Sequence, residues 1–312
     1  MLRNLLRSHP DLFLPSESHF IPPFCRAWGD PGDDREARRL GRRILRLHWV
    51  RWWGVELGAR EFDGCRSFAE VVDRIYGELA RREGARRWGD KTPGYALHIA
   101  TLAEIFPAAQ FVHIVRDGRD VALSLVRTGF GPRSVFTAAE YWRRHVAAAR
   151  RDGASLGPGR YLEVRFEELL RDTEATMRGV CALLGEPFDA RVLTPTPISR
   201  QPYGTVFGPR GPRQASDSEV VRANSGKWRS EMSPADLDRF EATAGDLLVE
   251  LGYELGGGRA PRRLWIAERI ARRAADRLLW ICYQLRRGEK RHWVPGELLL
   301  RWAAVRARWR TR

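Results

Sequence analysis

The stretch FVHIVRDGRDVALSL, residues 111–125, sets the end of an apolar strand directly against the start of a helix. The strand-like run covers residues 111–115, and a helical run follows from Val121, after a polar turn of two arginines, two aspartates and a glycine. In open α/β sheets, ligands bind beyond the carboxyl ends of the strands. A helix that begins there offers free N–H groups and the positive end of its dipole, which favour a phosphate. The stretch therefore predicts an α/β domain with an anion site at the edge of its sheet.

Two side chains of this stretch suit a bound anion. Arg116 leaves the strand at its carboxyl end, and Ser124 lies about two turns into the helix, where its hydroxyl can face the same edge. A guanidinium and a hydroxyl that converge on one anion are phosphate-binding chemistry. From spacing alone, an Arg/Asp-rich solvated turn is the alternative explanation.

The rest of the chain alternates extended and helical patterns, which favours a parallel sheet flanked by helices. The expected extended segments are 12–14, 111–115 and 161–165, and the expected helices are 1–8, 34–82, 94–105, 117–127, 137–150, 167–184, 233–251 and 261–312. Residues 194–222 are rich in Pro, Gly, Ser and Arg and show no periodicity.

The charge of the chain permits two explanations. The chain has 312 residues, of which 54 are basic and 39 acidic, for a net charge of +15. An anionic partner is one explanation; an arginine-rich composition spread through the chain is the other. Only Lys91, Lys227 and Lys290 are lysines. Because lysine can give up a proton and arginine effectively cannot, Lys91 and Lys227 become candidate site residues.

Cysteine usage and hydropathy bear on the cellular environment. The four cysteines are widely separated and have no metal-ligand spacing, so we expect no metal site and a reducing cytoplasm. No run reaches 18 consecutive apolar residues, so the sequence indicates no transmembrane helix.

Six motifs, in the right order, resemble those of the PAPS-dependent sulfotransferases, in their bacterial and tyrosylprotein-type branch (PAPS is 3′-phosphoadenosine-5′-phosphosulfate). They are SHPD with PSE at 8–17, WGDKTP at 88–93, IVRDGRDVALS at 114–124, YLEVRFEEL at 161–169, LLGEPF at 183–188 and NSGKWR at 224–229. The resemblance spans residues 1–253. It implies a P-loop-NTPase-like parallel sheet flanked by helices over residues 1–255, followed by a basic amphipathic helical tail over residues 256–312.

The resemblance also implies roles for individual residues. Arg116 and Ser124 would hold the 3′-phosphate of PAPS, while Lys91 would lie at the oxygen that bridges phosphate and sulfate. Glu17 matches the glutamate that acts as the base for the acceptor hydroxyl, and His19 is a rival base. The nucleotide would be covered by the segment Ser225, Gly226, Lys227 and Trp228.

The implied activity is transfer of a sulfuryl group from PAPS to a hydroxyl of an unidentified acceptor, which could be a carbohydrate, a lipid, a small molecule or a peptide. The family's Gly-x-x-Arg-Ser-Gly-Thr-Thr loop and the strand before it should precede Met1 and are missing here. A helix already in progress at Met1 has no N-cap, so we expect the true start to lie upstream. A non-catalytic anion-binding relative is the alternative. A nucleic-acid-binding module is disfavoured because the motifs lie at strand ends.

The C-terminal tail has helical spacing of apolar residues with arginines between them. The apolar positions are Leu264, Ile266, Ile270, Leu278, Leu279 and Ile281. We expect the tail to dock on its own domain or on a second subunit as a homodimer. Peripheral contact with an anionic membrane surface is the alternative, and nucleic acid is a third.

Overall fold

The computed structural model describes residues 1–128, 131–194, 225–256 and 265–287, with side chains in the last stretch described to residue 281. Its strands are β1 (Leu12–Phe13), β2 (Arg87–Trp88), β3 (Phe111–Val115) and β4 (Tyr161–Arg165). Its α-helices are α1 (Leu2–Leu6), α2 (Ile21–Trp28), α3 (Asp34–Leu45), α4 (His48–Arg51), α5 (Phe68–Arg82), α6 (Ile99–Ile105), α7 (Gly118–Val126), α8 (Val135–Ala154), α9 (Phe166–Arg171), α10 (Thr173–Leu184), α11 (Trp228–Glu231), α12 (Pro234–Glu250) and α13 (Ile266–Arg287). Short 3-10 turns cover Ala59–Phe62, Pro93–Leu97 and Ala190–Leu193.

The strands form two parallel pairs. β1 pairs with β2, and β3 pairs with β4 in a register that sets Phe111 opposite Tyr161 and Val115 opposite Arg165. Within the described residues, no strand joins β2 to β3. The predicted parallel sheet flanked by helices is confirmed, divided here into two pairs. The strand and loop expected ahead of Met1 stay a prediction.

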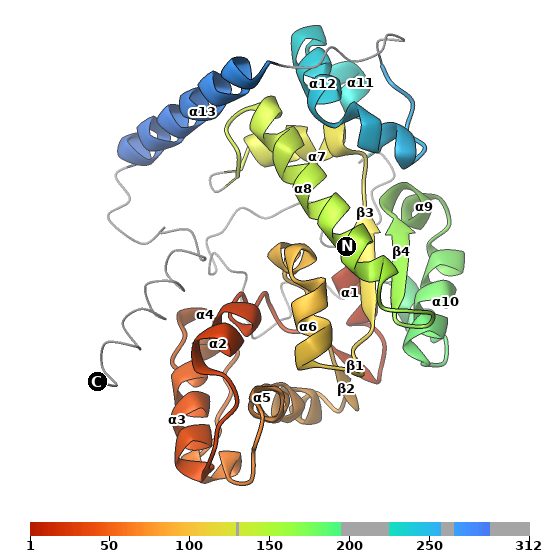
Figure 1. Cartoon of the computed structure of the whole chain (residues 1–312). Coiled ribbons are helices and arrows are strands. Elements are labelled where there is room, and N and C mark those ends of the chain that lie inside the picture. The colour runs from red at the N-terminus through yellow and green to blue at the C-terminus, as the bar shows by residue number, and fades with distance from the viewer. Residues whose placement is uncertain (129–130, 195–224, 257–264, 288–312) are drawn as a thin grey trace.

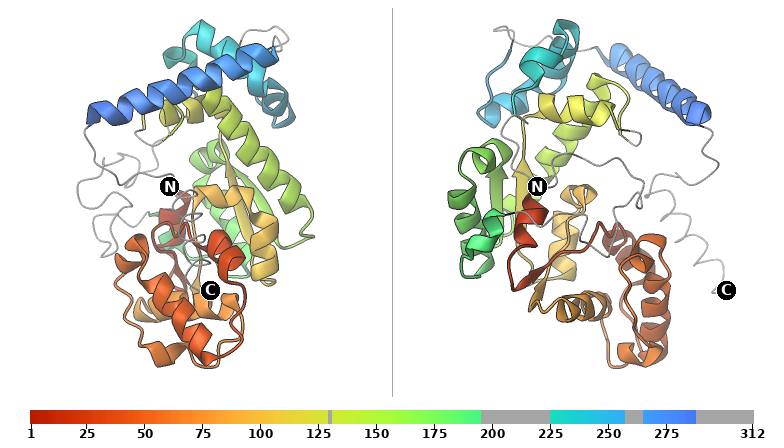
Figure 2. Two further views of the ribbon diagram at one scale, coloured as in Figure 1. Left: turned by 60° about the vertical axis from the view of Figure 1, so that its left-hand side comes forward. Right: turned by 180° about the vertical axis from the view of Figure 1, so that it is seen from behind.

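Helices surround both pairs (Figure 1). The long helix α8 runs beside β3, with α7 and α12 packed on it, while α9 and α10 lie next to β4. The helices α2 to α5 gather around β1 and β2 at the other end of the molecule, and the turned views of Figure 2 show the same separation. The described residues form three apolar cores, around Trp53 near α5, Trp142 in α8 and Leu5 in α1.

Several expected helices are divided in the structure, because polar caps interrupt them. Residues 34–82 form α3, α4, a 3-10 turn and α5, and the last of these helices begins at Ser67 with a capping box. Asp172 divides the expected helix 167–184, since its side chain accepts a hydrogen bond from Ala175 N and starts α10. Helix α8 begins after its N-cap Ser134, two residues ahead of the expected start at 137.

Candidate functional site

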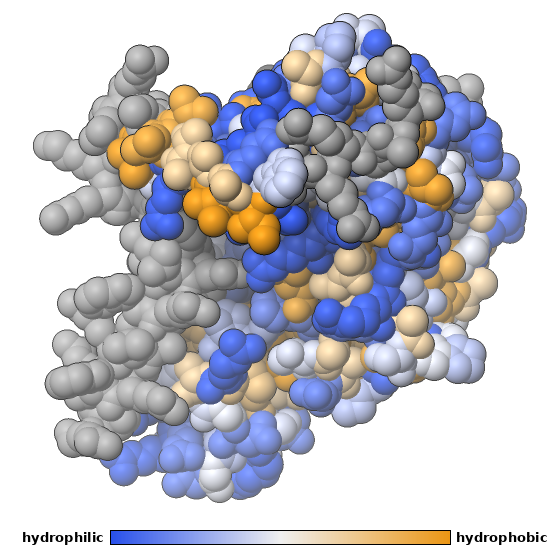
Figure 3. Space-filling view, turned by 45° about the horizontal axis from the view of Figure 1, so that its top comes forward, coloured by the Kyte–Doolittle hydropathy of each residue, from blue (hydrophilic) through white to orange (hydrophobic). Residues whose placement is uncertain are grey.

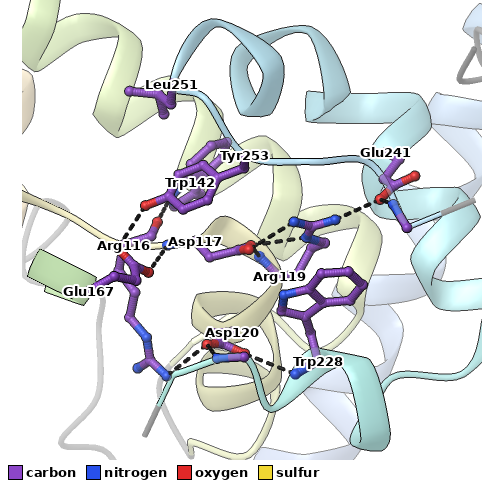
Figure 4. Close-up of polar contacts among 12 residues, drawn as sticks. Arg116, Asp117, Arg119, Asp120, Trp142, Glu167, Trp228, Glu241, Leu251 and Tyr253 are labelled. Atoms are coloured by element: carbon purple, nitrogen blue, oxygen red, sulfur yellow. Dashed lines mark hydrogen bonds and ion pairs between the residues drawn. The ribbon is translucent and has the colours of Figure 1, made fainter. Parts of the chain in front are cut away.

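The turn after β3 is fixed by its own side chains and by the neighbouring strand. Asp117 caps α7 by accepting a hydrogen bond from Arg119 N at 2.9 Å, which agrees with the expected helix over 117–127. The backbone N–H of Asp117 donates to Glu167 Oε1 at 2.9 Å, and Glu167 is the second residue of α9, which follows β4. Trp142 Nε1 in α8 donates to the carbonyl of Arg116 at 3.1 Å. Figure 4 shows these contacts converging on the turn.

Only glycine fits at the start of α7. A Cβ atom at Gly118 would lie 2.5 Å from the rings of both Trp142 and Phe240, which belong to α8 and α12. The tight approach lets α7 begin at Gly118, only three positions after the last residue of β3.

Arg119, the second arginine of the turn, stabilises the fold. Its side chain is 1 % exposed, and it pairs with Asp117 and Glu241 at 2.8 Å each. Its guanidinium also lies 3.6 Å from the centre of the Trp228 ring. Two carboxylates therefore offset the charge of this buried arginine, which would otherwise be strongly destabilising.

Asp120 joins the two segments that the sequence assigned to one nucleotide site. Its fully buried carboxylate accepts hydrogen bonds from the backbone N–H of Gly226 at 2.7 Å and of Trp228 at 2.9 Å. Arg116 Nη2 lies 3.4 Å from the same carboxylate. Reasoning from the sequence gave Asp120 no role. The signal was its spacing of four residues after Arg116, which places both on one face of the turn and helix.

The segment after residue 224 is shaped to present a lysine. Gly226 has a left-handed φ of +75°, which glycine adopts without strain, and Lys227 is the N-cap of α11. Trp228 is buried, while Ser225, Gly226 and Lys227 are half-buried. Ser124 is exposed on α7. Among the described residues, none forms a side-chain hydrogen bond or ion pair with Lys227 or Ser124, so both groups remain available to a ligand.

Glu17 and Lys91 are in direct contact, although they lie 74 positions apart in the sequence. Lys91 Nζ donates to Glu17 Oε1, and His19 Nε2 lies 3.2 Å from Glu17 Oε2. Burial acts to raise the pKa of Glu17, but the hydrogen bond from His19 and the charge of Lys91 outweigh it and lower that pKa to about 2. The sequence-predicted base, its rival and the predicted lysine therefore form one cluster.

A buried network of hydrogen bonds around Asp90 connects the two segments that carry Glu17 and Lys91. Asp90 accepts hydrogen bonds from Tyr76 Oη and Thr92 Oγ1, each at 2.7 Å, and burial raises the pKa of its carboxyl. The backbone N–H of Ser18 donates to Thr92 Oγ1 at 3.0 Å. The segments on either side of the Glu17–Lys91 contact are thereby held together. The sequence motif contained Asp90 and Thr92, but Tyr76 and Ser18 lie too far away in the chain for local patterns to reveal.

The predicted residues fall into two groups, each at strand ends. Glu17 and Lys91 follow β1 and β2, which are paired, while Arg116 directly follows β3. Within the described residues, no group of three His, Cys, Asp or Glu side chains is arranged to hold a metal ion. The chemistry of both groups is that of charged and hydrogen-bonding side chains.

Comparison with known proteins shows what this chain is similar to. A model of the sulfotransferase family matches residues 1–190. A protein-tyrosine sulfotransferase of Drosophila melanogaster is 23% identical over 295 residues, covering 90% of this chain and 55% of the relative. The nodulation protein NoeE of Sinorhizobium fredii is 26% identical over 284 residues, covering 81% of this chain and 63% of the relative.

Among solved structures, the sulfotransferase domain from the curacin biosynthetic pathway superposes with a TM-score of 0.53 at 21% identity, covering 81% of this chain and 93% of that domain. That likeness concerns the fold. The chain thus spans little more than half the length of its fly relative and nearly all of the solved domain. Since the family model covers well over half of its residues, this chain belongs to the sulfotransferase family.

Proposed function

We propose that this chain transfers a sulfuryl group from PAPS to a hydroxyl of an acceptor. The observation that carries the proposal is the contact between Lys91 and Glu17. A cation for the leaving oxygen and a carboxylate for the acceptor proton come from two distant segments and meet beside paired strands. Such a pairing is what a transfer between two oxygens requires.

We propose that the nucleotide end of PAPS binds at the residues beyond β3. Arg116, Ser124 and Lys227 supply two positive charges and a hydroxyl, and this donor set fits the 3′-phosphate. Asp120 would act as a positioning residue, because it holds the backbone on both sides of Lys227. We propose that Ser225, Gly226 and Trp228 shape the same binding segment, with Trp228 buried beneath it.

The chemistry follows from the two charges of the first group. When bound, PAPS supplies the sulfuryl group. Lys91 would stabilise the negative charge that develops on the bridging oxygen as its bond to sulfur breaks, and it can donate a proton there. Glu17 would accept the proton of the acceptor hydroxyl as the new oxygen–sulfur bond forms. Arg at position 91 could supply the charge but not the proton.

The low pKa of Glu17 depends on its contacts with Lys91 and His19. The hydrogen bond from His19 and the charge of Lys91 hold the carboxylate ionised, so it is a weak base while both contacts remain. Movement of Lys91 toward the leaving oxygen would remove one of them and raise the basicity of Glu17. His19 is the second candidate base, because Glu17 could instead orient its ring at 3.2 Å.

The test is transfer of labelled sulfur from PAPS to a panel of hydroxyl acceptors. Glu17→Gln keeps the size of the side chain but removes the base, so turnover should fall about a hundredfold or more. A larger loss in His19→Ala would assign the base to His19. Tight binding of 3′,5′-ADP without transfer to any acceptor would favour the alternative, a non-catalytic nucleotide-binding relative.

The acceptor class and the compartment are part of the proposal. Relatives named protein-tyrosine sulfotransferases support a peptide tyrosine as the first acceptor to try, with carbohydrate, lipid and small hydroxyl compounds next. We infer a cytoplasmic setting, supported by the free thiols of Cys25, Cys65 and Cys181.

A further inference from the structure

Helix α13 is attached to the domain by its polar face. Glu140 of α8 accepts hydrogen bonds from Arg273 Nη2 at 2.7 Å and from Arg269 Nη2 at 3.1 Å. Asp276 Oδ1 accepts from Thr137 Oγ1 at 2.7 Å and from the backbone N–H of Arg133 at 2.9 Å. The expected docking of the tail on its own domain is confirmed for α13, but it occurs through charges. Those contacts fix which side of the helix faces inward.

Beside these contacts, α13 carries an exposed apolar stripe, formed by Ile266, Ile270, Leu278 and Ile281. At about 100° per residue these four positions fall within an arc of roughly 120° on the helix. Ile266 is 77 % exposed, Ile270 60 % and Leu278 63 %. Figure 3 shows apolar surface along this outer helix. In an ordinary surface helix the apolar face packs on the core, whereas the apolar stripe of α13 is exposed.

The charge of the chain is concentrated in the same region. Residues 256–312 contain 16 basic and 4 acidic residues, so they carry +12 of the total +15. The arginines are spread through the chain, but acidic residues offset them over residues 1–255. The explanation of the net charge by composition alone is therefore insufficient for the tail.

Three occupants of the apolar stripe can be compared. A second copy of this chain would bring another segment of +12 against the first, and like charges would oppose that pairing. Nucleic acid would neutralise the charge but leave the apolar stripe in water. An anionic lipid surface satisfies both features, since apolar side chains enter the acyl boundary while arginines meet the headgroups.

We infer that α13 lies flat on an anionic lipid surface, with the apolar stripe turned into it. Arg277 is exposed on α13, and at about 100° per residue it lies within the stripe, between Ile266 and Ile270, from where its long side chain can reach the headgroups. No helix in the described part of the chain is long and apolar enough to cross a membrane, so the contact is peripheral. Because α8 holds both α13 and the turn at Arg116, the surface would also orient the proposed nucleotide site.

The test is sedimentation of the full chain with vesicles. Vesicles of phosphatidylcholine with about 30 mol% phosphatidylserine should bind the protein, more weakly as salt rises, and vesicles of phosphatidylcholine alone should not. The double variant Ile270→Glu/Leu278→Glu should lose about tenfold or more of the binding, because it places two charges in the apolar boundary.

The matched control is Val249→Glu, which changes an apolar residue of similar exposure, 58 %, on α12 and should bind as the unaltered protein does. Circular dichroism should show all variants folded, since every changed residue is exposed. Binding that is equal for neutral and anionic vesicles, or unaffected by the double variant, would overturn the inference. So would a dimer that the double variant abolishes in a protein that binds neither kind of vesicle.

Discussion

Asp120 accepts a hydrogen bond from the backbone N–H of Trp228 at 2.9 Å, across 108 positions of sequence. Its other carboxylate oxygen accepts from Gly226 N at 2.7 Å and lies 3.4 Å from Arg116 Nη2. One buried carboxylate thus holds in position both Arg116 and the segment that carries Lys227 in the proposed nucleotide site.

Asp120→Asn should weaken binding of 3′,5′-ADP by about tenfold, the scale of one hydrogen bond to a charged group. An amide keeps one acceptor oxygen but turns its NH₂ group toward the second backbone donor. Isothermal titration measures the affinity, and hydrogen exchange should show faster exchange at Gly226 and Trp228. Asp172→Asn, at the cap of α10, is the control. Faster exchange with unchanged affinity would remove this segment from the nucleotide site.

Gly118→Ala should lower the free energy of unfolding by about 1–3 kcal/mol, because its methyl group would press into two aromatic rings. Gly77→Ala is the matched control. Gly77 lies in α5 with nothing within 4 Å of a new Cβ, so this change should stabilise by about 0.5–1 kcal/mol. Urea unfolding measures both. Equal effects at the two positions would show that the start of α7 has more room than the structure gives it.

Local patterns in the sequence were sufficient for part of this architecture. The apolar runs that became β3 and β4 match the expected bounds, because each is a half-buried segment ended by charged residues. The Asp117 cap was also recognisable, since capping depends on neighbours two or three residues away. The motifs further indicated which segments would share a site.

Contacts over long distances could not be predicted in this way. Strand β2 has two residues, too few for any periodicity, and it exists because β1 pairs with it. The burial of Arg119 depends on Glu241, 122 positions away. The exposure of the apolar stripe of α13 could not be predicted either, because a helical pattern does not say which face of the helix contacts the domain. Only the contacts with Glu140 and Asp276 decide it.

Glu17 should make a pH-dependent contribution to stability. Its pKa is about 2 in the folded chain, below the ordinary value of 4.5, so the contribution is fully present above about pH 4.5 and is lost as the pH falls toward 2. The difference in free energy of unfolding between the unaltered protein and Glu17→Gln should therefore shrink from about pH 7 to about pH 3. Glu56→Gln, at an exposed glutamate, is the control. A difference that stays constant over this range would contradict the Lys91 and His19 contacts.

Lys91→Arg should separate binding from chemistry. The charge beside Glu17 remains, but the transferable proton does not, so sulfuryl transfer should fall about a hundredfold. Titration should give an affinity for 3′,5′-ADP within about twofold of the original, because that nucleotide lacks the sulfate. Lys290→Arg, at the lysine with no proposed role, serves as the comparison. Near-normal transfer in Lys91→Arg would exclude proton donation by this residue.

The most direct test of the account is a titration of the unaltered protein and Arg116→Ala with 3′,5′-ADP and with 5′-AMP, which lacks the 3′-phosphate. The unaltered protein should prefer 3′,5′-ADP, and Arg116→Ala should weaken that binding by about 10- to 150-fold while leaving 5′-AMP unchanged. Arg46→Ala, at an exposed arginine, should change neither. Equal affinity for the two nucleotides, or an Arg116→Ala variant that binds 3′,5′-ADP as before, would contradict the assignment of the turn after β3 to the 3′-phosphate.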